Sequence, residues 1–148
     1  MLLPLAACAG AASIVLQPAC SFPSTSIDDR AGAYAELYSG RPNPGWRLSR
    51  SETATLRQML EARTPGGPGA TPPGLGYRGI VVENLGAVLP GCAQLRAYRG
   101  TVTAQCPEGA RSLADTNRAV ERFLAETGLK EADASAYALV QQDLAAGG

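Results

Sequence analysis

Two acidic residues on or beside predicted strands, Glu36 and Glu83, are the side chains best placed for hydrolytic chemistry. Two carboxylates about 5–10 Å apart can hydrolyse a glycosidic bond, one as acid and the other as base or nucleophile. The remaining acids fall mainly at helix starts or on helix faces that we expect to be exposed: Glu52, Glu61, Asp115, Glu121, Glu126, Glu131 and Asp133. A small envelope hydrolase using Glu36 or Glu83 is therefore one alternative, although an outward-facing acid on a half-exposed strand is the more ordinary interpretation.

Other catalytic chemistries find little support in the residue types. The chain contains no histidine, which excludes a Ser-His-Asp triad, a Cys-His pair and a His-ligated zinc site. A serine or cysteine nucleophile would then need a lysine base, and Lys130 is the only lysine, with no Ser-x-x-Lys spacing leading to it. We therefore assign no catalytic residue, no metal site and no cofactor, and a non-catalytic protein is the favoured hypothesis.

The segment Gly74–Gly79 (GLGYRG) matches the GxGxxG pattern of dinucleotide-binding loops. That pattern binds a cofactor when it follows a strand, opens a helix and precedes an acid by about 20 residues. In this chain it follows a connector rich in proline and glycine and runs into a predicted strand. The glycines are better explained by the path of the backbone into the sheet.

A second group of residues favours binding rather than catalysis. Arg41, Asn43 and Trp46 fall in one turn-rich segment, and Tyr77 and Arg78 begin a predicted strand. Tryptophan, tyrosine and arginine dominate binding hot spots, and arginine can form two hydrogen bonds with a carboxylate or phosphate. The alternative is structural: Trp46 covers the core, and the two arginines pair with acids.

Composition limits the remaining classes. The 148 residues, 45% of them hydrophobic, suffice for one compact domain. Thirteen basic and thirteen acidic residues give no net charge, whereas a nucleic-acid-binding domain normally carries a basic excess. We expect no nucleic-acid partner.

The N-terminal segment predicts export. Residues 1–19 carry no charge, are mainly apolar and end in small residues, which is typical of a signal peptide spanning residues 1–20. The alternative, an N-terminal core helix, is opposed by the prolines and glycine that interrupt the segment. Cys8 and Cys20 are alternative lipidation sites, because Leu5–Cys8 resembles a bacterial lipobox and Cys20 follows the longer apolar run. Secretion without a lipid is a third possibility. Residues 21–32 are small and polar, as in a flexible tether that would hold a lipid-anchored domain beside a membrane.

Strands and turns are predicted from alternation and turn residues. We expect strands over residues 34–38 and 77–82, the latter central because its apolar run is continuous. Residues 94–98 and 101–105 read as a hairpin around Arg99-Gly100, with Ala97 opposite Val102 and Leu95 opposite Ala104. That register brings Cys92 near Cys106, so we predict a disulfide there, which an exported compartment would permit.

Three helices complete the expected domain. The first begins at Ser49, three residues before Glu52 as in a capping box, and stops at Thr64-Pro65-Gly66. Residues 64–76 form an exposed connector with nine prolines or glycines. The second helix has a capping box at Ser112 and Asp115 and ends before Gly128. The third spans residues 131–145. The buried face of the second helix is predicted to carry Leu113, Val120, Phe123 and Leu124. That of the third is predicted to carry Ala136, Leu139, Val140 and Leu144.

The strings Ser39–Pro44 (SGRPNP) with Trp46, GLGYRG over 74–79, and the helix around residues 118–121 resemble those of a loose group of small, largely uncharacterised bacterial proteins. The resemblance spans residues 33–128. It implies that both loops are family features, and it brings no activity or ligand with it.

These patterns together predict a single α+β domain over residues 33–146, with a small, mostly antiparallel sheet and helices on one side. The favoured function is an exported cell-envelope protein that binds a protein or small molecule through Arg41, Asn43, Trp46, Tyr77 and Arg78. The carboxylate hydrolase and a purely structural lipoprotein remain the alternatives.

Overall fold

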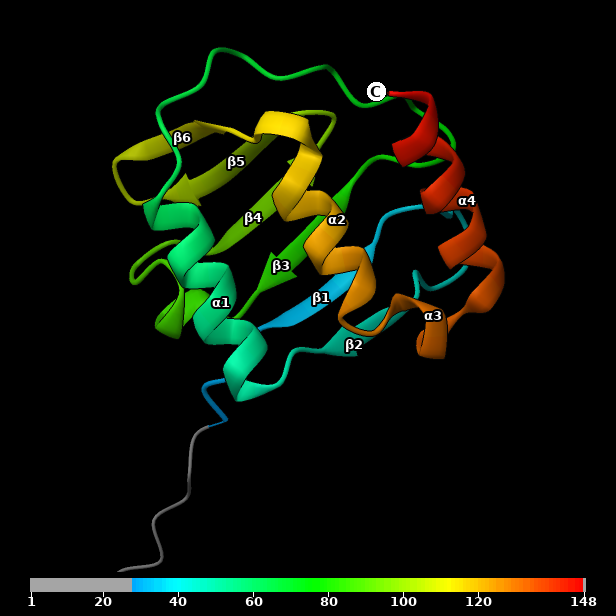
Figure 1. The fold of residues 1–148 in the computed structure, drawn as a ribbon, viewed down its shortest axis with the longest axis horizontal. Coiled ribbons are helices and arrows are strands. Elements are labelled where there is room, and N and C mark those ends of the chain that lie inside the picture. The colour runs from blue at the N-terminus through cyan, green and yellow to red at the C-terminus, as the bar shows by residue number, and fades with distance from the viewer. Residues whose placement is uncertain (1–27, 148) are drawn as a thin grey trace, which may run out of the picture.

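The computed structural model describes residues 28–147, which form one α+β domain, as the sequence predicts. Six strands make one antiparallel sheet in the order β2-β1-β3-β4-β5-β6, with helices laid across one face (Figure 1). The predicted signal peptide, with Cys8 and Cys20, lies outside the described residues, as does the first part of the tether.

The first helix lies between the second and third strands of the chain, and the other helices follow the last strand. The strands are β1 (Gly32–Ala35), β2 (Gly45–Arg47), β3 (Ile80–Glu83), β4 (Gln94–Tyr98), β5 (Thr101–Cys106) and β6 (Gly109–Ala114). The helices are α1 (Arg50–Glu61), α2 (Ala119–Glu126), α3 (Leu129–Ala132) and α4 (Ala134–Ala146), with 3-10 turns η2 (Leu85–Ala87) and η3 (Thr116–Arg118).

The sheet has one face against helices and one polar face. Ala33, Val82 and Leu95 share the buried side through their register and belong to a single core with the apolar faces of α1, α2 and α4. Alternate residues point to the other side. We call that side the open face; it carries Tyr34, Glu83, Gln94, Arg96, Thr103 and Gln105.

Helix α1 begins as its sequence predicts. Ser49 Oγ accepts the Glu52 backbone N–H at 3.1 Å, and the Ser49 N–H donates to Glu52 Oε2 at 2.7 Å, which completes the capping box. Leu56 and Leu60 are buried on one face of the helix. The helix ends at Glu61, ahead of the predicted proline stop.

Two strand boundaries differ from the prediction for local reasons. β1 ends at Ala35, because Asn43 Oδ1 accepts the N–H groups of Leu37 and Tyr38 at 2.9 and 2.8 Å and turns the chain away. β3 starts only at Ile80, because Gly79 has a φ of +109°, outside the extended region. The predicted central position of β3, between β1 and β4, is confirmed.

The hairpin of β4 and β5 has the predicted register. Ala97 pairs with Val102 and Leu95 with Ala104, around Arg99 and Gly100, which both have positive φ. This is the geometry that favours two-residue hairpin turns. The predicted disulfide is also present, with the Cys92 and Cys106 sulfurs 2.12 Å apart and the two Cα atoms 4.0 Å apart.

The predicted helix start at Ser112 is wrong. Residues 109–114 form β6, which pairs with β5 along its length and places Leu113 opposite Val102. The chain turns back at once after Cys106 and completes an edge that would otherwise be unpaired. Asp115 still caps a helix, because its Oδ1 accepts the Val120 N–H at 2.9 Å and its Oδ2 the Glu121 N–H at 3.2 Å.

The C-terminal helix is divided at Asp133 into α3 and α4. The Asp133 side chain accepts the Ala136 N–H at 2.9 Å and so caps α4. Ala136, Val140 and Leu144 are buried as predicted, but Leu139 is 48% exposed. The described part of the chain therefore has four helices rather than three, although α3 is a single turn.

The Pro/Gly connector contains little regular structure, as predicted, but it is not wholly free of the sheet. Pro65 forms an isolated bridge with Leu113, and the Gly66 N–H donates to Ser112 O at 2.9 Å. The connector then runs across the end of the sheet to β3 (Figure 1). It therefore lies at the opposite end of the domain from Asp28, where the described part of the chain begins.

Candidate functional site

The two predicted binding loops meet at one end of the sheet. Ala35 pairs with Ile80, so the segment that follows β1 and the segment that precedes β3 leave the sheet together. Tyr38 lies between them. The Arg41 guanidinium is 3.6 Å from the centre of the Tyr38 ring, and Arg78 Nη2 donates to the Tyr38 carbonyl at 3.3 Å.

Asn43 and Trp46 have structural contacts instead. Asn43 shapes the turn through the two N–H groups described above. Trp46 lies in β2, not in a loop, and its Nε1 donates to Thr127 Oγ1 at 2.7 Å at the end of α2. Trp46 pairs with Ala33 and points to the helix side of the sheet, so it does not join Arg41 and Arg78.

Arg78 belongs to a small charged group on the open side. Its Nη2 is 3.8 Å from Glu36 Oε1, while Arg96 bonds both Glu36 Oε2 and, at 2.6 Å, the Arg78 carbonyl. The exposed fractions of these three side chains are between 20% and 28%. The negative charge of the Glu36 carboxylate is therefore balanced by two nearby guanidinium groups.

Glu36 and Glu83 lie on the same face but far from each other along the strands. Glu83 pairs with Gly32, whereas the Glu36 N–H bonds the Gly79 carbonyl, four positions away. At about 3.3 Å per residue, this places their backbones some 13 Å apart. The arrangement does not resemble the paired carboxylates of a glycosidase.

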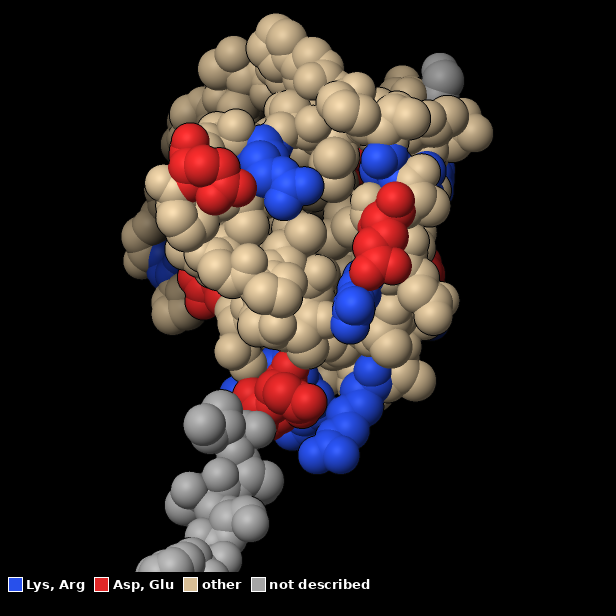
Figure 2. Space-filling view, turned by 90° about the vertical axis from the view of Figure 1, so that its left-hand side faces the viewer, with Lys and Arg blue, Asp and Glu red and all other residues tan. Residues whose placement is uncertain are grey.

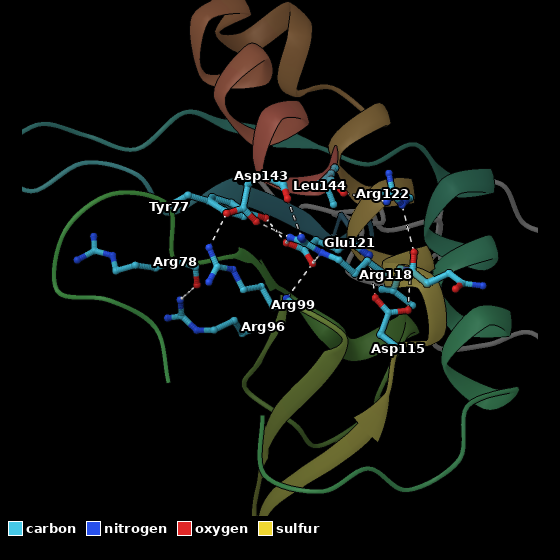
Figure 3. A network of polar contacts seen from close by, with 12 residues as sticks. Tyr77, Arg78, Arg96, Arg99, Asp115, Arg118, Glu121, Arg122, Asp143 and Leu144 are labelled. Carbon is cyan, nitrogen blue, oxygen red and sulfur yellow. Dashed lines mark hydrogen bonds and ion pairs between the residues drawn. The ribbon is translucent and has the colours of Figure 1, made fainter. Parts of the chain in front are cut away.

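The structure reveals a buried polar network that the sequence did not indicate (Figure 3). Glu121, predicted to be exposed, is fully buried. Asp115 and Arg118 are buried too, with exposed fractions of 1% and 5%. Glu121 Oε1 accepts Tyr77 Oη at 2.6 Å and Arg118 Nη2 at 2.8 Å. Its Oε2 accepts Arg118 Nε at 2.9 Å and the Arg99 backbone N–H at 3.0 Å.

Asp143 extends this network to α4. Its Oδ1 accepts Arg118 Nη2 at 2.7 Å, its Oδ2 accepts Arg99 Nη2 at 2.8 Å, and its carbonyl accepts Arg118 Nη1 at 2.9 Å. Every carboxylate of the network is thus bonded by at least one cation or N–H group. The network joins the β4–β5 turn, α2, α4 and the start of β3.

These contacts shift the acidity of several groups. Burial is the largest cause that raises the pKa of the Tyr77 hydroxyl above its usual range, and the neighbouring Glu121 carboxylate adds to it. For Asp143, burial alone would raise the pKa, but the hydrogen bonds from Arg99 and Arg118 outweigh it and hold the pKa below its usual value. Tyr77 therefore stays protonated and Asp143 ionised at neutral pH.

The backbone is strained where the network starts. Asn117 and Arg118 have φ values of +57° and +54°, a left-handed conformation that is uncommon for residues other than glycine. Such strain persists only where surrounding contacts fix it, and it often marks functional sites. In this domain the bidentate pairing of Arg118 with Glu121 supplies those contacts.

A cavity of about 450 Å³ lies beside the network, lined by Arg99, Gly100, Asp115, Asn117, Arg118, Arg122 and Gly147. Arg99 and Arg118 pair with Asp143 and Glu121, and the Asp115 carboxylate accepts two backbone N–H groups. Arg122 donates to the carbonyls of Asn117 and Leu144 at 3.1 and 3.0 Å. The chemistry of this cavity is that of a satisfied structural network.

One feature of the sequence could have indicated this network, namely the i,i+3 spacing of Arg118 and Glu121. It could not reveal burial, because Tyr77 and Asp143 are distant in the chain. The predicted site residue Tyr77 is thus a member of the core network. Arg41 is exposed in its loop, whereas Arg78 is only partly exposed and its guanidinium donates to the Tyr38 and Gly74 carbonyls.

Charges elsewhere are mixed. On the side shown in Figure 2, acidic and basic side chains are interspersed, and neither sign forms a broad patch.

Within residues 28–147, no group of three potential ligands could hold a metal ion, and no helix has the length and apolarity needed to cross a membrane.

Comparison with known proteins found no matching family model, no matching curated protein and no matching solved structure.

Proposed function

We propose that the chain is an exported cell-envelope protein whose single domain is a non-catalytic binding module, held beside a membrane when its N-terminus is lipidated. The uncharged leader supports export. The Cys92–Cys106 disulfide is compatible with an oxidising compartment, where such bonds persist.

The observation that carries the proposal is the position of the N-terminal junction. Asp28 pairs with Arg47 at the end of β2, and Asn84, just after β3, donates to the carbonyls of Asp28 and Arg30 at 2.9 and 2.8 Å. Together these contacts fix the entry of the chain at one end of the sheet.

The loop surface lies at the other end. β1 runs from Gly32, beside the junction, toward Tyr38 and Arg41, and β3 runs from Arg78 back to Glu83. A tether attached at the junction would therefore hold the domain with Arg41 and Arg78 directed away from the anchor. That orientation suits a domain that presents a surface to partners, which is less expected of a purely structural lipoprotein.

The hydrolase alternative is less favoured by the geometry. Glu36 is held by Arg96 and approached by Arg78, and Glu83 is distant from it along the sheet. A carboxylate held by two guanidinium groups and distant from a second acid does not match the facing pair of carboxylates that a glycosidase needs.

Export is tested by fractionating cells that express the full chain with a C-terminal tag. We expect processed protein in the envelope or medium, with a mass increase of the size of a lipid. One of the two variants, Cys20→Ser or Cys8→Ser, should lose that increase, and it identifies the lipidated cysteine. An unmodified N-terminus beyond Cys20 would leave secretion without an anchor. Full-length protein retained in the cytosol would overturn the proposal.

The binding role is tested by site-specific photo-crosslinking in intact cells. A crosslinker at position 41, on the loop surface, should give discrete adducts, while one at the exposed position 142 of α4 serves as the control. Adducts from neither position, or equal adducts from both, would favour the purely structural lipoprotein.

A further inference from the structure

We propose that a trough on the open face of β4 and β5 binds a neutral sugar unit, an inference that rests on the proposed binding function and names its ligand class. The trough has a volume of about 210 Å³. Its floor and one wall come from two adjacent strands and the Pro/Gly connector: Gln94, Arg96, Tyr98, Thr101, Thr103 and Gln105, with Gly69, Ala70 and Pro72.

The register of the hairpin places the floor side chains in three facing pairs. Gln94 lies opposite Gln105, Arg96 opposite Thr103, and Tyr98 opposite Thr101. The connector lies over the last pair, because a Cβ atom added to Gly69 would approach Thr101 Cβ to 3.0 Å. One end of the trough is therefore covered and the other is open.

The floor differs from the Glu121 network in its free hydrogen-bonding capacity. Within residues 28–147, the side chains of Gln94, Thr101, Thr103 and Gln105 make no hydrogen bond, and the buried Tyr98 hydroxyl has no partner. Each amide and hydroxyl can both donate and accept. The trough thus offers several uncommitted polar groups close together on rigid strands.

The charge of the trough favours a neutral ligand. Arg96 is the only ionisable residue in its floor besides Tyr98, and its guanidinium is bonded to Glu36 and to the Arg78 carbonyl. Sugar hydroxyls also donate and accept, so they match amides and hydroxyls without requiring a charged partner. Ala70 and Pro72 provide a small apolar wall for the C–H face of a sugar ring.

The position of the trough makes a peptide the less suitable occupant. Peptides commonly bind by adding a strand to an exposed sheet edge. β4 and β5 are interior strands, flanked by β3 and β6, and their backbone groups are already paired. A peptide in the trough would have to bind through side chains alone.

The test is an NMR titration of the purified, oxidised protein with D-glucose, D-galactose, D-mannose and N-acetyl-D-glucosamine, each to 100 mM. We expect at least one sugar to give saturable shifts in the amides of β4 and β5. The affinity should fall at least tenfold in Thr103→Val/Gln105→Leu, because two hydrogen-bonding groups are lost while the strand is retained.

The matched control is Thr55→Val/Gln142→Leu, which makes the same changes on the exposed surfaces of α1 and α4 and should bind as the wild type does. If the double variant fails to fold, Thr103→Val alone should weaken binding measurably. The proposal is overturned if no sugar gives shifts, if the shifts map elsewhere, if Thr103→Val binds unchanged, or if tri-alanine competes for the same amides. Because purified protein is used, a negative result leaves the export experiment unaffected.

Discussion

Arg118 and Glu121 form a bidentate ion pair that is almost completely excluded from water. Arg118 Nε lies 2.9 Å from Glu121 Oε2, and Arg118 Nη2 lies 2.8 Å from Glu121 Oε1, with exposed fractions of 5% and 0% for the two residues. Removing one partner of such a pair leaves an uncompensated buried charge, which is far more costly than the pair itself is stabilising.

We therefore expect Glu121→Ala to lower the free energy of unfolding by about 3–5 kcal/mol. Tyr77 would lose its acceptor, and Arg118 would lose its bidentate partner and keep only Asp143. Urea unfolding followed by Trp46 fluorescence measures the change. The control Glu131→Ala removes an exposed acid and should stay within about 0.5 kcal/mol of wild type. Equal effects of the two substitutions would contradict the burial of Glu121.

Asp143 should make the protein sensitive to acid. Its folded-state pKa is below the ordinary value of 3.8, so its contribution to stability is present above pH 3.8 and is lost as the pH falls through the lower folded pKa. Asp143→Asn should be less stable than wild type at pH 7, and the difference should shrink toward pH 2. Thermal unfolding over this pH series is the measurement. A difference that does not change with pH would show that the charge of Asp143 is unimportant.

Gly128 should be intolerant of a side chain because of Trp46. A Cβ atom at position 128 would lie 2.6 Å from Trp46 Cδ1, so Gly128→Ala should destabilise the domain by about 1–3 kcal/mol through overpacking. It should also shift the fluorescence of Trp46, the only tryptophan.

A double-mutant cycle isolates this contact. In a Trp46→Ala background, which removes Cδ1 and Cγ, the two atoms nearest position 128, the cost of Gly128→Ala should fall substantially. An unchanged cost would mean that contacts other than the Trp46 ring set the requirement for glycine.

Loss of the Cys92–Cys106 disulfide should destabilise the domain by about 3 kcal/mol in the chain-entropy view, given the 14-residue separation of the two cysteines. The comparison is best made in a Cys8→Ser/Cys20→Ser background, so that only this pair contributes. Cys92→Ser/Cys106→Ser and the reduced parent should unfold at similar, lower urea concentrations. Two titratable thiols in the oxidised, folded parent would show that the pair does not form.

Local patterns predicted those elements whose determinants are close in the chain. The Ser49–Glu52 capping box, the Arg99-Gly100 turn with its register, and the disulfide that follows from that register depend on residues within about 15 positions of one another. The prediction of a helix that starts at Ser112 failed. A strand there is stabilised by pairing with β5, and the short sequence Ser112–Asp115 imitates a helix cap equally well.

The candidate site divides in the same way. Arg41 and Arg78 could be chosen as surface residues by type alone, and the structure brings them to the same end of the sheet through Tyr38. Tyrosine is also common at binding surfaces, so Tyr77 could be chosen by residue type. Its hydroxyl instead donates to the buried Glu121, 44 positions away. Residue type does not reveal which polar group is buried.

By itself, the sequence determined the α+β class, the hairpin and its sulfur bridge, and it supplied the uncharged N-terminal residues on which the proposal of export rests. Only the tertiary structure decided that Glu121 is a core residue, that Trp46 faces the helices, and that unbonded amides and hydroxyls line a trough under the connector. The physical reason is that propensity, capping and turn geometry act over a few residues. Burial and polar pairing, in contrast, depend on which distant segments pack together.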